Sequence, residues 1–454
     1  MTLNKQIIIN ISIAILTIWL IKIATVFDDL GKISALFNLL IKGSFIVLVS
    51  YLFILMFRTT DNKKFLIIVN IGLTCFFLIS GSLIIEFSSN YFNKKKDQIY
   101  NQKRIEAANK AGINFDMRNI SDVANELSAN IVYAPIMFLK EYTENDDYKD
   151  SIFPLSGISK TLTVDCNENG PYSVYFSDRY GFNNNDRIYN DENKKKIFII
   201  GDSMVQGNCV DQENTISGRL FNKGYQTIGL GMSGNGPLLE FAVLKEYALK
   251  LDPYAIIWVY FENDIKDLKR DLQIPILREY IYNNYTQNII NRQDEVDNFW
   301  HLWSPKEILP NKKKNTLKKN LKRIERSFFL KPIKDLIFKF NNEYIQYDKI
   351  NDKYIDEFID IIKKSKYEAE KKGAHFYFVY LPLYESVKKK EPKNKKIILE
   401  KLKDINVDYI DFLSELKKTE DPLSFFPFKL KGHFTNEGYK MIADSIEKKF
   451  LRNY

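Results

Sequence analysis

The tetrapeptide Gly-Asp-Ser-Met at positions 201–204 contains the first candidate for chemistry in this sequence. It follows a short apolar run, so Ser203 would lie in a tight turn between a strand and a helix. A hydroxyl at such a turn can project into a cleft and act as a nucleophile, while the N–H groups of the helix N-terminus favour negative charge. The alternative is that Asp202 or Ser203 only caps the helix that follows.

Two further motifs offer hydrogen-bond donors suited to an oxyanion. Glycine recurs through residues 231–237, and glycines there would let the backbone approach a substrate and direct an N–H at developing negative charge. Asn263, in the motif Phe-Glu-Asn-Asp at 261–264, is a neutral side-chain donor. An ordinary Gly/Pro turn and an Asx-turn or helix cap are the alternatives for the two motifs.

A general base has few candidates, because the chain contains three histidines, His301, His375 and His433. His375 begins a predicted strand, and His301 lies between two tryptophans. His433 alone lies in a loop that precedes a predicted helix, which places it like a base at a cleft. Ser203 and His433 together predict nucleophilic acyl transfer.

Apolar runs and amphipathic stretches alternate along the C-terminal two-thirds of the chain, and this alternation would bring the motifs together. Strands are predicted at Lys196–Gly201, Gln226–Leu230, Ala255–Phe261, His375–Leu381 and Val407–Phe412, and helices at Leu238–Leu251, Asp352–Lys372 and Asn436–Arg452. Such alternation indicates βαβ units and a parallel sheet covered by helices. Reactive groups of such sheets collect beyond the carboxyl ends of the strands, where all four motifs fall.

The order Gly-Asp-Ser, then Gly, then Asn-Asp, then a near-terminal His resembles the GDSL/SGNH hydrolase superfamily over about Lys194 to Tyr454. The resemblance implies a flavodoxin-like three-layer α/β domain with Ser203 as nucleophile and His433 as base. It also implies an oxyanion hole formed by the N–H groups of Ser203 and Gly234 with the Asn263 side chain. No metal or cofactor is implied.

Two departures from the superfamily pattern affect the predicted site. Glu262 stands where these enzymes usually have a Gly before the Asn, and Leu430 and Lys431 stand where an Asp usually precedes the His. A triad acid fixes the tautomer of the base and stabilises its imidazolium form. Asp411 and Asp421 are the candidates for that acid. A backbone carbonyl could replace it, and a chain that has lost catalysis is the further alternative.

The N-terminal part contains three apolar stretches of bilayer-spanning length: Ile7–Phe27, Ile33–Phe57 and Phe65–Phe87. We therefore expect residues 1–89 to form three transmembrane helices, with a buried helical bundle as the alternative. The basic link 58–64 favours a cytoplasmic N-terminus and a polar domain outside the cytoplasm, whereas Lys94–Lys96 favour the reverse. Our expectation is a bacterial inner-membrane protein with its catalytic domain on the periplasmic or extracytoplasmic side.

Residues 90–192 are polar and are interpreted as a linker or accessory segment before the domain at 193–454. Helical pattern occurs at Ile105–Ala111 and Asp122–Ser128, and extended pattern at Thr161–Phe176. About 268–347, where strand patterns are absent, a helical insertion is expected. Cys166 and Cys209 both fall in the polar part and would form a disulfide in an oxidising compartment, with two free buried thiols as the alternative.

The stretch 178–182 (Asp-Arg-Tyr-Gly-Phe) resembles large membrane-linked bacterial members of the superfamily, many of which belong with modification of cell-surface polysaccharide. We therefore expect a serine esterase or O-acyltransferase acting on acyl, in particular acetyl, esters of surface glycans. Its partners would be an acylated carbohydrate, the bilayer, and a membrane acyltransferase or polysaccharide assembly protein. A non-catalytic glycan-binding or scaffold subunit is the alternative. The net charge of +9 comes from short lysine runs typical of solvated loops and does not indicate a nucleic-acid partner.

Overall fold

The computed structural model describes residues 99–139, 142, 151–191, 194–283, 285–307, 352–389, 391–452 and 454. The chain divides into two compact units, Met1–Glu86 and Phe87–Tyr454, and all described residues belong to the second. The three predicted membrane spans lie outside the described residues. Within those residues, no helix is both long and apolar enough to cross a membrane.

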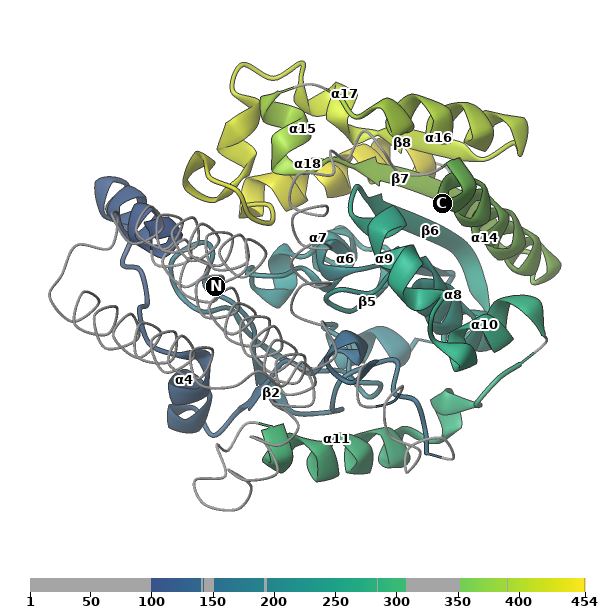
Figure 1. The fold of residues 1–454 in the computed structure, drawn as a ribbon, viewed down its shortest axis with the longest axis horizontal. Helices are drawn as coiled ribbons and strands as arrows, with labels where there is room; N and C mark the ends of the chain where they lie inside the picture. Colours follow the sequence, from purple (N-terminus) through teal and green to yellow (C-terminus); the bar gives the residue numbers. More distant parts are fainter. Residues whose placement is uncertain are drawn as a thin grey trace, which may run out of the picture. The chain divides into compact units, whose positions relative to one another are not determined.

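A five-stranded parallel sheet forms the centre of the second unit (Figure 1). Its strands are β4 (Lys196–Gly201), β5 (Gln226–Gly231), β6 (Pro253–Phe261), β7 (His375–Leu381) and β8 (Asp408–Asp411). They lie in the order β5-β4-β6-β7-β8, and every neighbouring pair is parallel. Counted along the chain, this order is 2-1-3-4-5, the flavodoxin-like order, in which ligands bind where the strand order reverses. That point lies beside β4.

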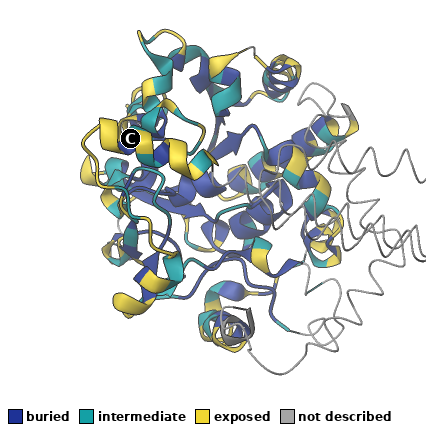
Figure 2. Ribbon diagram, turned by 60° about the vertical axis from the view of Figure 1, so that its left-hand side comes forward, coloured by how far each residue is buried: buried dark blue, intermediate teal, exposed yellow. Residues whose placement is uncertain are grey.

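Helices cover both faces of the sheet, so its strands are apolar on both sides, as the strand patterns predicted (Figure 2). Phe198, Ile200 and Trp258 belong to the core that α8 (Pro237–Glu246), α14 (Asp352–Lys371) and α16 (Lys393–Asp404) share. Residues Ile197 and Ile199 point to the opposite face. There the core includes α6 (Ser203–Gln206), α7 (Ile216–Asn222), α17 (Phe412–Leu416) and α18 (Asn436–Ile446).

The predicted elements of the sheet layers agree closely with the structure. β4 and β7 have the predicted bounds, β5 and β6 are longer by one and two residues, and β8 is shorter by one residue at each end. The predicted helix 238–251 is α8 followed by a 3-10 turn at Ala248–Lys250, and the predicted helix 436–452 is α18 followed by a π-helical turn at Glu447–Leu451.

The described part of residues 90–192, interpreted as a linker or accessory segment, folds into the same compact unit as the α/β domain. It contains a helix over 99–110, α4 (Ile120–Glu126), and a small sheet of β1 (Asn130–Ile131), β2 (Leu162–Val164) and β3 (Val174–Phe176). Asn184 donates to the carbonyl of Gly229 and accepts from its N–H, so this segment covers the outer edge of β5. The buried Asp178 carboxylate holds the segment in shape by accepting from Tyr189 and Asn184.

The described part of the expected insertion is helical, as predicted, and residues 308–351 lie outside the described residues. It comprises α9 (Asp264–Asp271), α10 (Pro275–Tyr282) and α11 (Gln293–Glu307). Helix α11 packs on residues 151–191. Trp300 donates to the carbonyl of Ser156, and Asp297 accepts from the N–H and hydroxyl of Ser159. A short helix, α15 (Tyr384–Lys388), follows β7.

Candidate active site

Ser203 is the first residue of α6, directly after β4, at the point where the strand order reverses. The preceding Asp202 is the helix cap, since its Oδ1 accepts from the N–H of Met204 at 2.9 Å. The Ser203 hydroxyl is therefore not the group that caps α6. A Cβ at Gly201 would lie 2.8 Å from the carbonyl oxygen of Val259, so glycine allows β4 and β6 to approach closely here.

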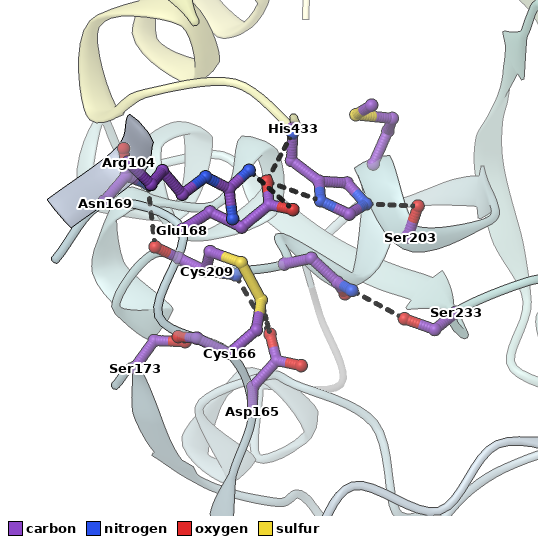
Figure 3. The surroundings of a disulfide bond; sticks show 12 residues. Arg104, Asp165, Cys166, Glu168, Asn169, Ser173, Ser203, Cys209, Ser233 and His433 are labelled. Carbon is purple, nitrogen blue, oxygen red and sulfur yellow. Dashed lines mark hydrogen bonds and ion pairs between the residues drawn. A yellow bond between two sulfur atoms is a disulfide. The ribbon is translucent and has the colours of Figure 1, made fainter. Parts of the chain in front are cut away.

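His433 meets Ser203 across a separation of 230 residues (Figure 3). It lies in the loop before α18, whose N-cap is Thr435. The Nε2 atom of His433 is 3.0 Å from the Ser203 hydroxyl oxygen, and its Nδ1 atom is 3.1 Å from Oε2 of Glu168. A carboxylate can only accept, so Nδ1 carries the proton and the Nε2 lone pair faces the hydroxyl.

Glu168 is the carboxylate that orients the base, and the two predicted candidates are wrong. Asp411 caps α17 by accepting from the N–H and hydroxyl of Ser414, and it pairs with Lys395 at 2.7 Å. Asp421 pairs with Lys429 at the surface. Glu168 lies 265 residues before His433, in the segment interpreted as accessory. One signal could have found it: the predicted disulfide brings residue 166 to the helix that begins at Ser203.

The predicted Cys166–Cys209 disulfide is present, with 4.8 Å between the two Cα atoms. It joins the loop that contains Glu168 to the residues that follow α6. Two hydrogen bonds reinforce the junction, from the Cys209 N–H to Asp165 at 3.0 Å and from Asn169 to the Cys209 carbonyl at 2.9 Å. The residues on both sides of Glu168 are therefore attached to the element that carries the nucleophile.

The electrostatics of the pair favour an ionised acid and a basic imidazole. Burial alone would raise the pKa of Glu168, but the attraction and hydrogen bonds of His433 and the charge of Arg104 lower that pKa to about 2. Burial alone would lower the pKa of His433, but the neighbouring Glu168 carboxylate raises it above its usual value. An imidazolium at His433 would therefore be stabilised by this carboxylate.

The three predicted oxyanion donors differ in the contacts that they make. Among the described residues, the N–H groups of Ser203 and Gly234 have no protein acceptor, as a hole awaiting an oxyanion requires. Gly234 adopts a φ of +74°, a left-handed conformation that glycine tolerates. Asn263 donates one amide hydrogen to Asp267 at 2.9 Å, which leaves its second amide hydrogen. The oxyanion role of these groups stays a prediction.

Glu262, which replaces the usual glycine, has a structural use. Its buried carboxylate accepts from the Tyr380 hydroxyl and the Leu383 N–H, each at 2.9 Å, and from the Ser386 hydroxyl. It therefore anchors the chain that leaves β7 and makes no contact with Ser203 in the described structure. Asn263 lies two residues after the end of β6, despite the departure at position 262.

Glu168, Cys209 and His433 lie close enough together to suggest metal ligands. The Cys209 sulfur, however, is bonded to Cys166 and is not a thiolate, the form that binds metals. Both ring nitrogens of His433 already face Ser203 and Glu168. This arrangement fits acyl transfer better than a metal centre.

The sheet order and the Glu168–His433–Ser203 arrangement define an α/β domain with the site of a serine hydrolase. Similar solved structures include a lipase/acylhydrolase from Enterococcus faecalis (12% identity, TM-score 0.31) and a G-D-S-L family lipolytic protein from Desulfitobacterium hafniense (14%, 0.31). An acetyl xylan esterase, AlAXEase, is also similar (13%, 0.30). Each match covers 56% of this chain, and they cover 94%, 99% and 100% of those chains.

One of these neighbours, the lipolytic protein, is described as a member of the G-D-S-L family. At such identities and TM-scores the neighbours carry no argument about activity, so the functional argument rests on the site itself. No protein-family model matches the sequence, and no curated protein matches it.

Proposed function

We propose that residues 194–454, together with the loop of Glu168, form a serine ester hydrolase that works through an acyl-enzyme. The observation that carries the proposal is the continuous hydrogen-bonded chain from Glu168 through His433 to Ser203. The three groups come from segments far apart in the sequence and meet beyond the carboxyl end of β4. A chance meeting of three such groups in the correct order is a poor explanation.

The reaction follows from the positions of the protons. His433 Nε2 takes the Ser203 proton as the hydroxyl oxygen attacks the ester carbonyl carbon, and the negative oxygen is stabilised by the Ser203 and Gly234 N–H groups and Asn263. The carbon–oxygen bond to the alcohol then breaks, and the alcohol leaves with the proton from His433. Water or a sugar hydroxyl next attacks the acyl carbon while His433 takes its proton as base. The bond between the acyl carbon and the Ser203 oxygen then breaks, and Ser203 takes the proton back from His433. The products are a carboxylic acid or a new ester.

The finer assignment is an esterase or O-acyltransferase for acetyl esters of cell-surface glycans at the bacterial inner membrane. Two features support it: the 178–182 stretch resembles membrane-linked members of the superfamily, and the disulfide is typical of oxidising compartments outside the cytoplasm. Three apolar N-terminal stretches would hold the domain near membrane-bound glycans and an acyl-supplying membrane partner.

Labelling with a fluorophosphonate probe tests the mechanism, because the probe modifies only an activated serine. The full-length protein should be labelled and should hydrolyse p-nitrophenyl acetate, and Ser203→Ala should lose both properties. Ser233→Ala is the matched control, since its hydroxyl faces Asn208 rather than His433. A folded wild-type protein that neither labels nor turns over would contradict the proposal and favour the glycan-binding scaffold. Acetyl transfer to an added oligosaccharide would separate the transferase from the esterase.

A further inference from the structure

The helix over 99–110 lies against Glu168, although it belongs to residues 90–192, which were interpreted as a linker or accessory segment. Its Arg104 is 7% exposed, which is unusual for an arginine without a specific role. The guanidinium Nη2 lies 3.3 Å from Oε1 of Glu168 and donates to the carbonyl of Lys431 at 2.9 Å. Arg104 therefore contacts both Glu168 (Figure 3) and the loop that carries His433.

The two carboxylate oxygens of Glu168 are divided between two partners. Oε1 faces Arg104, while Oε2 accepts from the N–H and from Nδ1 of His433. A carboxylate held at both oxygens cannot rotate without breaking one of these contacts. The charge of Arg104 also lowers the pKa of Glu168, in addition to the larger lowering by His433.

The backbone of the His433 loop is held by the same helix. The Lys431 carbonyl, two residues before His433, accepts from the Tyr100 hydroxyl as well as from Arg104. Gly432 lies directly on the ion pair: a Cβ there would be 2.5 Å from Oε2 of Glu168 and 3.0 Å from Nη2 of Arg104. Because glycine has no Cβ, it allows the loop to approach the Glu168–Arg104 ion pair this closely.

We propose that Arg104 is a positioning residue for the catalytic pair. It orients Glu168 and holds the His433 loop in place, so that the rate of hydrolysis depends on the helix over 99–110. The inference rests on the proposed function, and Arg104 itself touches neither Ser203 nor the imidazole ring. The consequence is that the chain preceding the α/β domain completes its active site.

Replacement of the arginine in two backgrounds tests the proposal. Arg104→Met should lower kcat for p-nitrophenyl acetate roughly ten- to a hundredfold with KM nearly unchanged, because a misplaced acid and base affect the reaction and not substrate binding. In a Glu168→Gln background the same change should cost several-fold less than in the wild type, because only the hydrogen bond to the Lys431 carbonyl is left for Arg104 to lose. Arg104→Lys, which keeps the charge, should recover part of the lost rate.

Lys103→Met is the matched control, because it removes an exposed cation from the same helix. It should leave kcat and the thermal unfolding midpoint unchanged. Equal losses from Arg104→Met in the wild-type and Glu168→Gln backgrounds would overturn the proposal and leave a purely structural arginine. An unchanged kcat in folded Arg104→Met would overturn it as well. Failure of the proposed function would instead appear in the wild-type protein, as an absence of probe labelling.

Discussion

Replacing Glu168 by Gln tests the central feature of the site, the charge behind the base. Glutamine keeps the shape of the side chain and one carbonyl oxygen. That oxygen should stay towards the two N–H groups of His433, which leaves the amide nitrogen facing the Arg104 guanidinium. The substitution therefore removes the negative charge while most of the packing is kept.

The expected loss follows from the electrostatics of the pair. The pKa of Glu168 is about 2, compared with about 4.3 for an unperturbed glutamate, and such a difference corresponds to about 3 kcal/mol, or roughly a hundredfold in rate. This difference is the net result of burial, which raises the pKa, and of His433 and Arg104, which lower it. Loss of the correct tautomer adds to it, and replacing the triad carboxylate by its amide in a serine protease costs about 10⁴ in kcat. We expect kcat to fall by roughly 10²–10⁴.

The pH profile gives an independent check. The base must be neutral to accept the serine proton, so kcat/KM rises with pH through the pKa of His433 in the free enzyme. The Glu168 carboxylate raises that pKa. Its removal should therefore move the acidic limb of the profile to lower pH. Asp421→Asn, which alters a surface ion pair with Lys429, should change neither kcat nor the position of the acidic limb of the pH profile.

This prediction can be tested with stopped assays of p-nitrophenyl acetate hydrolysis across the pH range. Circular dichroism would establish that each variant is folded. A folded Glu168→Gln protein with wild-type kcat and an unmoved acidic limb would refute the assignment of Glu168. The site would then function as a Ser–His dyad. A lowered kcat with an unmoved limb would also contradict the reasoning, since the charge would not be sensed by His433.

Three further predictions concern the surroundings of the triad. Gly432→Ala should lower kcat roughly tenfold or more with little change in KM, because its Cβ would push on Glu168, and an active alanine variant would contradict that close approach. The Cys166→Ala/Cys209→Ala double variant should be less stable by roughly 2–4 kcal/mol in chemical denaturation, and an unchanged denaturation midpoint would contradict a structural disulfide. Asn263→Ala should reduce kcat roughly 10²-fold in the same ester assay if its amide joins the oxyanion hole, and an intact rate would remove it from that role.

Local sequence patterns were sufficient to predict the sheet and to select Ser203 and His433 as candidates. A parallel strand covered on both faces must be apolar along its whole length, so the runs at β4 and β7 predicted their own bounds. Ser203 and His433 could be selected because each lies next to a strand or helix boundary that the sequence marks. Their contact then follows from the rule that the carboxyl ends of parallel strands form one edge.

The acid could not be selected in this way. Asp411 and Asp421 are nearer to His433 in sequence, yet the fold turns them to Ser414 and Lys429, while Glu168 arrives from a separation of 265 residues. What a carboxylate does depends on which groups face it after folding, and no local pattern encodes that. The sequence by itself therefore determined the sheet and selected Ser203 and His433, which the fold brings to 3.0 Å of each other. Only the tertiary structure, through a disulfide and a buried arginine, decided which carboxylate completes them.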